Sequence, residues 1–130
     1  MFEVGLVALL NATPGLTAIV GNRIYPVQLP DETTSFPALT YQIVSGLPEW
    51  SLDRSKYNEK RVQFDAWAYV YGDCKAILKQ LEYALDGFDG MFSEGTRVIS
   101  TISDVLVDDW NANARVYRIL ADYIFQFVET

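Results

Sequence analysis

Alternation of apolar and polar residues in the final run of the chain, 116–128, constrains the fold more than any other feature of the sequence. Successive side chains of a strand point to opposite faces of its sheet, so this run has one apolar face. That face consists of Tyr117, Ile119, Ala121, Tyr123, Phe125 and Phe127. Residues 39–44 and 61–68 also alternate, and 96–107 is rich in residues that favour strands. The sequence therefore predicts four strands.

Three other segments have the spacing of helices. Apolar residues form one stripe in 2–11, and they recur at steps of three and four residues in 72–86. The short segment 14–20 begins with Pro14, which suits the first position of a helix, and Gly21 follows its end. We therefore predict two short N-terminal helices and one longer helix between the second and third strands.

The segment 23–36 separates the short helices from the first strand. It contains Pro26 and Pro30, which interrupt regular hydrogen bonding, so we expect an extended strap over the surface. The element order is then helix, helix, strand, strand, long helix, strand, strand. This order predicts an α+β fold in which a four-stranded antiparallel sheet has its helices packed on one face. A chain of 130 residues, half of them hydrophobic, fits a single domain over 1–130.

The opposite face of the predicted sheet is not uniformly polar. In the last strand it presents Val116, Leu120, Ile124 and Val128 among Arg118, Asp122 and Gln126. A sheet face that meets only water is more polar than this. Two explanations stay open: either the strap covers this face, or another subunit contacts it. In the second case Arg118 and Asp122 are candidate interface residues.

A long polar connection, 46–59, joins the first two predicted strands. Loops of this length are usually functional or disordered. In a functional reading it is an arm that reaches a neighbouring subunit or an axial partner, with aromatic side chains as anchors. Its candidate contact residues are Trp50, Arg54, Lys56 and Tyr57, with Lys60 just beyond it. The other reading is a solvated, partly disordered hairpin.

Few residues are suited to catalysis or metal binding. The chain has no histidine and one cysteine, Cys74, which falls on the apolar stripe of the long helix and is predicted to be buried. The carboxylates of Glu94, Asp104 and 108–109 are more typical of solvated turns than of an acid–base pair. Residues 86–90 lack the ligand pattern of a calcium loop. We therefore predict no enzymatic activity, no cofactor and no metal.

The net charge and the length of the apolar stretches argue against nucleic acid and membranes as binding partners. Ten basic and seventeen acidic residues give a formal charge of -7, which disfavours the phosphate-neutralising surface of a nucleic-acid-binding protein. The longest apolar stretches, such as 4–10, fall short of the roughly 20 residues that span a bilayer. No signal peptide or membrane anchor is predicted, and we expect the protein to be made and kept in a cytoplasm.

Several short phrases occur in an order and spacing that cover nearly the whole chain. They are ALL at 8–10, LTAIV at 16–20, GNRIYP at 21–26, FPALTY at 36–41, GLPE at 46–49 and RVQFDAWA at 61–68. No single phrase is specific, but their conjunction is. On these phrases the chain resembles the tail-terminator, or tail-completion, proteins of long-tailed bacteriophages, which also occur as minor tail proteins of prophages.

The resemblance implies a structural subunit that forms a homohexameric ring on the head-proximal end of the tail tube. Such a ring stops tube growth and presents a surface to head-completion, or connector, proteins. The implied partners are other copies of the chain, the major tail tube protein and a head-completion protein, with DNA only as a passing polymer. The implied location is the head–tail junction of the virion, after assembly in the host cytoplasm.

Two alternatives stay open at this point. A head-closure, or stopper, protein of the head–tail connector is also a small sheet-based ring subunit. A ligand-binding or enzymatic α+β domain would instead have a pocket between the sheet and the N-terminal strap.

Overall fold

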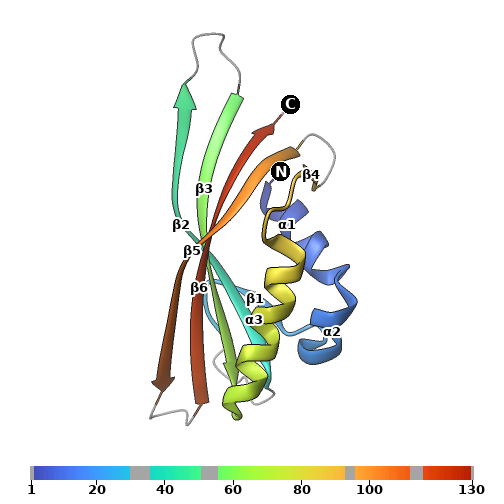
Figure 1. The fold of residues 1–130 in the computed structure, drawn as a ribbon, viewed down its shortest axis with the longest axis vertical. Helices are drawn as coiled ribbons and strands as arrows, with labels where there is room; N and C mark the ends of the chain where they lie inside the picture. The colour runs from blue at the N-terminus through green and yellow to red at the C-terminus, as the bar shows by residue number, and fades with distance from the viewer. Residues whose placement is uncertain (1, 30–35, 51–55, 93–95, 112–115, 130) are drawn as a thin grey trace.

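Three helices cover one face of a six-stranded sheet in the part of the chain that the structure describes (Figure 1). The computed structural model describes residues 2–29, 36–50, 56–92, 96–111 and 116–129. The elements are α1 (Phe2–Asn11), α2 (Pro14–Val20), β1 (Ile24–Pro26), β2 (Ala38–Trp50), β3 (Lys56–Ala68), α3 (Tyr71–Leu85), β4 (Gly90–Met91), β5 (Thr96–Asn111) and β6 (Val116–Glu129). The predicted α+β class with helices on one face is confirmed.

The sheet has two more strands than predicted, and it is mixed. Its strands lie in the order β1-β2-β3-β6-β5-β4, and β1 pairs with β2 in parallel while all other neighbours are antiparallel. The prediction of a four-stranded antiparallel sheet was therefore wrong at both edges, although it found the four central strands. β1 and β4 are only three and two residues long, too short for a two-residue alternation to be detected.

The first edge strand comes from the segment that was predicted to be a strap. The Leu39 N–H donates to the Arg23 carbonyl over 2.9 Å, and the Val27 N–H donates to the Tyr41 carbonyl over 2.7 Å. The described part of the strap therefore runs along the edge of β2 instead of crossing the sheet. Residues 30–35 of the strap lie outside the described residues.

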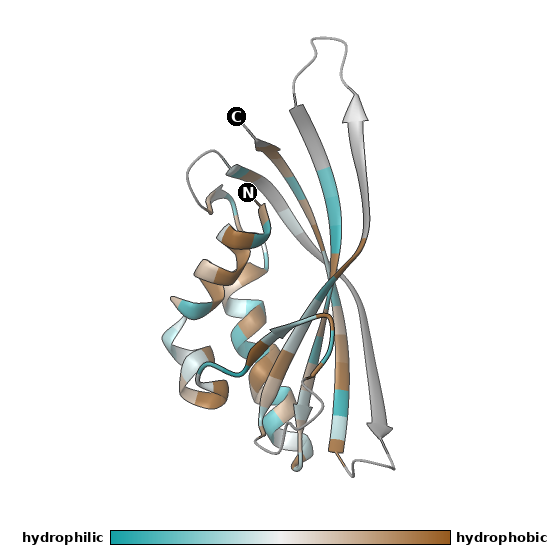
Figure 2. Ribbon diagram, turned by 180° about the vertical axis from the view of Figure 1, so that it is seen from behind, coloured by the Kyte–Doolittle hydropathy of each residue, from teal (hydrophilic) through white to brown (hydrophobic). Residues whose placement is uncertain are grey.

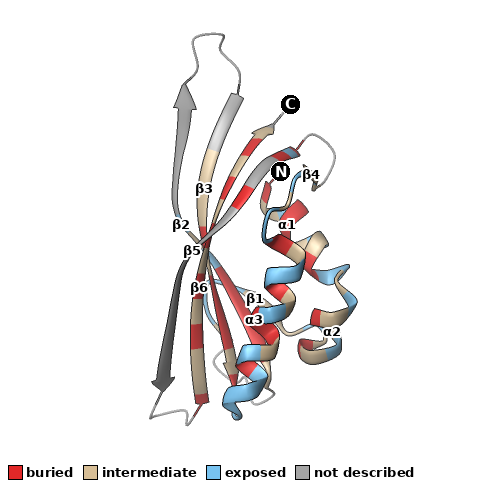
Figure 3. Cartoon of the chain, in the orientation of Figure 1, coloured by how far each residue is buried: buried red, intermediate tan, exposed pale blue. Residues whose placement is uncertain are grey.

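Aromatic side chains close the core beside the N-terminus. The Phe2 ring stacks on Phe127 with 4.5 Å between centroids and meets Phe125 edge-on at 5.2 Å, geometries that add to the gain from apolar burial. Fully buried residues from all three helices and the inner face of the sheet complete the core (Figure 3): Leu6, Leu10, Leu16, Leu39, Phe64, Ile77, Leu81, Leu85 and Ile119. The apolar face predicted for the last strand is the core face.

Helix α3 matches the predicted long helix to within one residue at each end. Its buried residues recur at steps of three and four positions: Cys74, Ile77, Leu78, Leu81 and Leu85. Asp73 lies in the first turn, where a carboxylate interacts favourably with the helix dipole. Gly87 follows the helix with φ at +69°, a conformation that costs glycine little. The apolar stripe of α3 packs on β3 and β6.

The β2–β3 hairpin projects beyond the helical layer (Figure 1). Its strands pair as far as Trp50 and Lys56, so most of the connection predicted over 46–59 is strand, and only 51–55 lie outside the described residues. Pro48 is compatible with this part of β2 because an edge strand needs no N–H toward a neighbour. The predicted long loop was therefore wrong, and the projecting arm is a β-hairpin.

The β5–β6 hairpin is also longer than its sequence predicts. β5 continues to Asn111 and pairs there with Val116, whereas a turn was predicted from Asp108 onward. Residues 112–115 lie outside the described residues. Seen from behind (Figure 2), apolar and polar segments alternate along the described part of the last strand, as expected for a sheet covered by helices on one face.

Candidate assembly surfaces

A polar network centred on Asp65 lies on the sheet face opposite the helices. Arg118 on β6 donates to Asp65 Oδ2 through Nη2 over 2.7 Å and through Nε over 3.2 Å. Gln63 Nε2 donates to Asp65 Oδ1 over 2.9 Å. The Asp65 side chain is only 8% exposed, and charge-assisted hydrogen bonds to both of its oxygens offset the loss of water.

Trp67 extends this network toward β2. The Arg118 guanidinium lies over the Trp67 ring at 5.0 Å from its centroid, and the indole N–H donates to Thr40 Oγ1 over 3.1 Å. Arginine stacked on tryptophan gains a cation–π attraction as well as its hydrogen bonds. The network thus joins β2, β3 and β6 into one rigid unit on the uncovered face.

Further polar contacts connect β3 and β6 toward the projecting hairpin. Arg61 Nη1 and Asp122 Oδ2 are 3.2 Å apart, and Gln126 Nε2 donates to Glu59 Oε1 over 3.2 Å. Because acidic and basic groups alternate on this face, it presents compensated charges instead of a strong field of one sign.

Exposed aromatic residues gather where β3 leads into α3. Tyr69 and Val70 are 55% and 58% exposed, and Tyr71 is 38% exposed. Phe36 meets the Tyr69 ring edge-on at 5.0 Å, and Tyr71 meets Tyr117 edge-on at 5.6 Å. Exposed aromatic clusters are typical of protein contact surfaces. This surface was not predicted from the sequence, although three large apolar residues in succession at a strand–helix turn, 69–71, are a signal for it.

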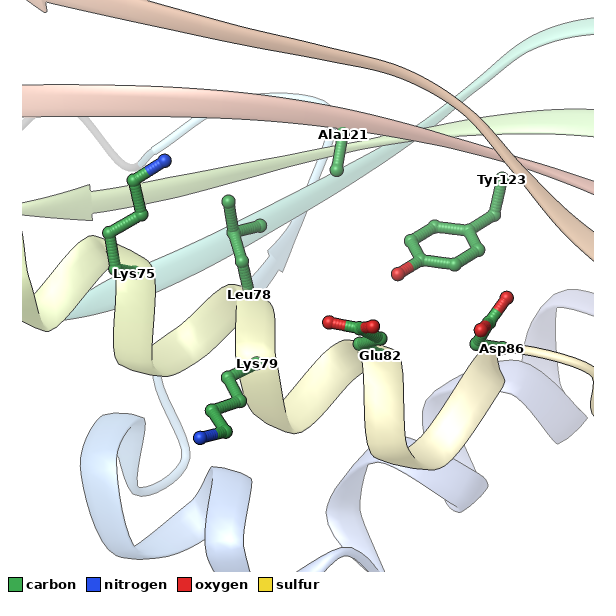
Figure 4. Close-up of a pocket in the computed structure, with 7 residues that line it drawn as sticks. All are labelled: Lys75, Leu78, Lys79, Glu82, Asp86, Ala121 and Tyr123. Carbon is green, nitrogen blue, oxygen red and sulfur yellow. The ribbon is translucent and has the colours of Figure 1, made fainter.

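A cleft of about 390 Å³ lies between α3 and β6 (Figure 4). Its described lining consists of Lys75, Leu78, Lys79, Glu82, Asp86, Ala121 and Tyr123. Burial raises the pKa of Tyr123 to about 12, and the negative charges of Glu82 and Asp86 add to the effect. Tyr123 therefore keeps its proton to a higher pH than an ordinary tyrosine. The cleft does not lie between the sheet and the strap, where the ligand-binding alternative would place a pocket.

Lys60 occupies a different position from the other candidate arm residues. Its ammonium lies over the rings of Phe2 and Phe127, at 5.6 Å and 5.8 Å from their centroids. Lys60 is thus on the helix side of β3 and covers the aromatic end of the core. Arg118 and Asp122 lie on the opposite face of the sheet, where Arg118 binds Asp65 and Asp122 pairs with Arg61.

The remaining candidates belong to the tip of the β2–β3 hairpin. Trp50 is the last residue of β2, and Lys56 and Tyr57 begin β3, with Trp50 and Lys56 as register partners. Only the backbone of these three residues is described, and Arg54 lies outside the described residues. The fold therefore brings this group to the end of one projecting hairpin, away from Arg118 and Asp122.

The thiol of Cys74 lies in the core. Its sulfur lies 3.4 Å from the Ala66 carbonyl and 3.5 Å from the Tyr117 carbonyl, and the side chain is fully buried. This confirms the predicted core position. A buried thiol behaves as a small apolar side chain.

No metal-binding group of three or more His, Cys, Asp or Glu side chains occurs within the described ranges. Glu94 falls outside those ranges, and Asp104 and 108–109 belong to a part of β5 of which only the backbone is described. Within the same ranges no single helix is long and apolar enough to cross a membrane; α1 and α2 pass that test only as a pair, bent by 81°.

Fold and surfaces together define a structural α+β subunit with a rigid, polar sheet face, projecting hairpins and an exposed aromatic cluster. The sequence model of the family "Tail completion protein gp17" matches residues 4–125. This chain therefore belongs to that family of structural tail completion proteins, and it is not an enzyme. The resemblance noted from the short sequence phrases is confirmed.

Comparison with solved structures supports the fold independently of sequence. A chain of the "virion of native gene transfer agent (GTA) particle" superposes with a TM-score of 0.81. The match covers 97% of this chain and 93% of that chain, at 16% sequence identity. No curated protein sequence matches this chain. A similarity this complete at so low an identity shows that the two chains share one fold.

Proposed function

We propose that this protein closes the head-proximal end of a tail tube as a ring of identical subunits and then forms the surface to which the head attaches. The observation that carries the proposal is the family match over residues 4–125. The similarity to a chain of a phage-like virion particle supports it. In this role the protein is a component of the virion at the head–tail junction.

Termination of a tube requires binding and no chemistry. The growing end of a helical polymer exposes an interface that recruits the next subunit, and a ring that covers this interface without recreating it stops growth. Its partners are then the major tail tube protein on one side, a head-completion protein on the other, and copies of the chain beside it.

The projecting β2–β3 hairpin suits an axial contact. It extends past the helical layer (Figure 1), and its strands end at Trp50 and begin again at Lys56 and Tyr57, with Arg54 between them in the sequence. Aromatic and arginine side chains are enriched at the centres of protein interfaces. We assign the tip to contact with the tube or the head-completion protein.

DNA passes through the ring without being held. The formal charge of -7 repels phosphate, and the polar network on the uncovered sheet face compensates most of its own charge. A lumen formed by this face lets a polyanion slide, because the two arginines described on it, Arg61 and Arg118, are already paired with Asp122 and Asp65.

Deletion of the gene in its own phage or prophage tests the proposal. We expect tails of uncontrolled length that fail to join heads, seen by electron microscopy, and restoration of normal particles by the wild-type protein. Normal tails joined to heads in the deletion strain would contradict the proposal. Tails of correct length that nevertheless lack heads would indicate the stopper role of the head–tail connector.

Charge reversal at the hairpin tip tests its assignment. The double variant Arg54→Glu, Lys56→Glu is expected to fail to restore particles while keeping the wild-type melting temperature, because neither residue belongs to the described core. The control is Phe64→Ala, which removes a fully buried ring and is expected to cost about 3–5 kcal/mol of stability. A loss of stability of that size in the tip variant would contradict the assignment.

A further inference from the structure

Both edges of the sheet are covered over only part of their length. β1 pairs with β2 at Leu39–Tyr41 (register with Ile24–Pro26), and β4 pairs with β5 at 97–98. The Gly87 N–H adds one bond, to the Thr101 carbonyl over 3.1 Å. Among the described residues, β2 beyond Tyr41 and β5 beyond Thr101 have a neighbouring strand on one side only.

Backbone groups at these positions face away from the sheet. Tyr41 accepts from Val27 and Thr101 accepts from Gly87 across the outer edges. Backbone groups in a strand point to alternate sides, so those two residues further along, at Ile43 and Ser103, face the same edges. Each edge therefore offers N–H and C=O groups with no strand beside them in the described part of the chain.

The residues of the two uncovered segments favour pairing. β2 reads QIVSGL at 42–47, with no charge and no proline, and β5 reads ISDVLV at 102–107, with Asp104 as its only charge. Proteins usually protect an open edge with lysine, other charges, proline or a β-bulge. Neither segment contains lysine or proline, but each contains one register shift, between Ile43 and Ser45 on β2 and between Ser103 and Leu106 on β5. On β2 the first such residue is Pro48, immediately after this segment. We call these two segments the β2 edge and the β5 edge.

The chain turns sharply away from β2 where the β2 edge begins. The Gln28 N–H donates to the Pro26 carbonyl over 2.7 Å, which closes a γ-turn around Val27 with φ at +66°. This conformation is strained for a β-branched residue. The strained turn ends β1 and leaves Ile43 uncovered.

Strand directions allow two copies to join edge to edge. β2 is antiparallel to β3, β3 to β6, and β6 to β5, so β5 runs opposite to β2. Placing the β5 edge of one copy beside the β2 edge of the next therefore continues the antiparallel alternation. This contact is heterologous, and contacts of that kind close into rings when the rotation fits.

The β2 edge and the β5 edge lie on opposite sides of the sheet, but they begin at the same level along the strands. Ile43 pairs with Val62, Val62 with Tyr123, and Tyr123 with Ser103. From this row the β2 edge runs toward one end of the molecule and the β5 edge toward the other. Strands of a closed sheet are tilted and staggered, so an offset of this kind is compatible with closure.

We propose that the β5 edge (102–107) of each copy pairs antiparallel with the β2 edge (42–47) of the next copy, so that the subunits share one continuous sheet. The inference rests on the ring of the proposed function and specifies its lateral contact. The helices then form one wall of the ring, and the Asp65 network forms the other.

Hydrogen exchange measures this contact directly. Wild-type protein is compared as a monomer and as a ring, assembled at high concentration or on purified tail tubes. We expect amide exchange over 42–47 and 102–107 to slow by a factor of about 10 or more in the ring, because those N–H groups gain partners. Unchanged exchange in both segments of an assembled ring would overturn the edge pairing and leave the ring itself intact.

Proline variants test the same contact genetically. Ile43→Pro and Ser103→Pro each remove a backbone N–H that faces the edge. The controls Ile43→Ala and Ser103→Ala shorten the same side chains but keep that N–H. We expect light scattering to show that only the proline variants lose the ring. Rings from both proline variants, or a wild-type dimer paired through two β5 edges, would overturn the inference. If wild-type protein forms no ring even on tail tubes, the proposed function fails with it.

Discussion

The guanidinium of Arg118 on β6 binds the carboxylate of Asp65 on β3 at 2.7 Å, on the face of the sheet that carries no helix. The Arg118 side chain is 30% exposed and that of Asp65 is 8% exposed. Arg118 also lies over Trp67, whose indole is bonded to Thr40 on β2. Through Asp65 and Trp67, Arg118 thus connects β6 to β3 and β2 on the uncovered sheet face, which we assign to one wall of the ring.

Breaking this pair should lower stability clearly. Arg118→Ala leaves the buried Asp65 carboxylate without its cation, and we expect a loss of about 2–3 kcal/mol in the free energy of unfolding, measured by urea denaturation. The matched control is Arg61→Ala, whose partner Asp122 is more exposed, and we expect a loss of about 1 kcal/mol or less there. Equal losses in the two variants would show that burial of Asp65 does not set the difference.

Stability should fall at alkaline pH because of Tyr123. Its pKa is about 12 in the folded protein and about 10 when unfolded. Above pH 10 the unfolded chain releases this proton first, so stability is complete below pH 10 and decreases as the pH rises toward 12. A fully buried group with this shift would account for roughly 2.7 kcal/mol; because the cleft is open to solvent, we expect about 1 kcal/mol.

The variant Tyr123→Phe isolates this contribution. It keeps the ring and removes the titrating hydroxyl, so the fall in melting temperature between pH 10 and 12 should become smaller than in the wild type. Absorbance titration of the tyrosines should show one fewer group titrating late. An identical pH profile in the variant would mean that another group causes the alkaline loss.

Lys60 should contribute to folding more than to assembly. Its ammonium covers the rings of Phe2 and Phe127, and cation–π contacts of this kind contribute about 0.5–2 kcal/mol. We expect Lys60→Glu to lower the melting temperature, and Lys60→Met, which keeps the apolar stem, to lower it less. Lys56→Glu at the hairpin tip is the control and should leave the melting temperature unchanged. A Lys60→Glu variant as stable as the wild type would contradict this position for Lys60.

Much of the fold could be predicted because its core obeys simple periodicities. On β3, Val62, Phe64 and Ala66 alternate with polar or outward-facing residues, and on α3, Ile77 and Leu81 are four positions apart. All five side chains are fully buried. Burial of one face of each element produced a pattern that sequence reasoning could detect. The family resemblance rested on other evidence, since only one of its phrases, RVQFDAWA at 61–68, lies in these two elements.

The features that could not be predicted are set by contacts between strands that are distant in the sequence, and not by which residues are buried. Gly46 and Pro48 are typical of a loop, yet they lie in β2 because backbone pairing with β3 continues past them. The Arg118–Asp65 contact joins residues 53 positions apart, and no local pattern marks it. Arg118 was a candidate for contact between subunits, whereas the structure shows a bond within one chain; its role in assembly stays a prediction.

Glycine should stabilise the strained turn at position 27 more than alanine does. Val27 has φ at +66° and a side chain that is 60% exposed, so its removal costs little packing. We expect Val27→Gly to be about 1 kcal/mol more stable than Val27→Ala in thermal or urea unfolding, because only glycine adopts this φ freely. Both variants keep the N–H that donates to Tyr41, so loss of that bond cannot explain a difference. If the two variants unfold at the same temperature, the turn around Val27 is not strained. A strained turn would then not be the reason why β1 ends before Ile43.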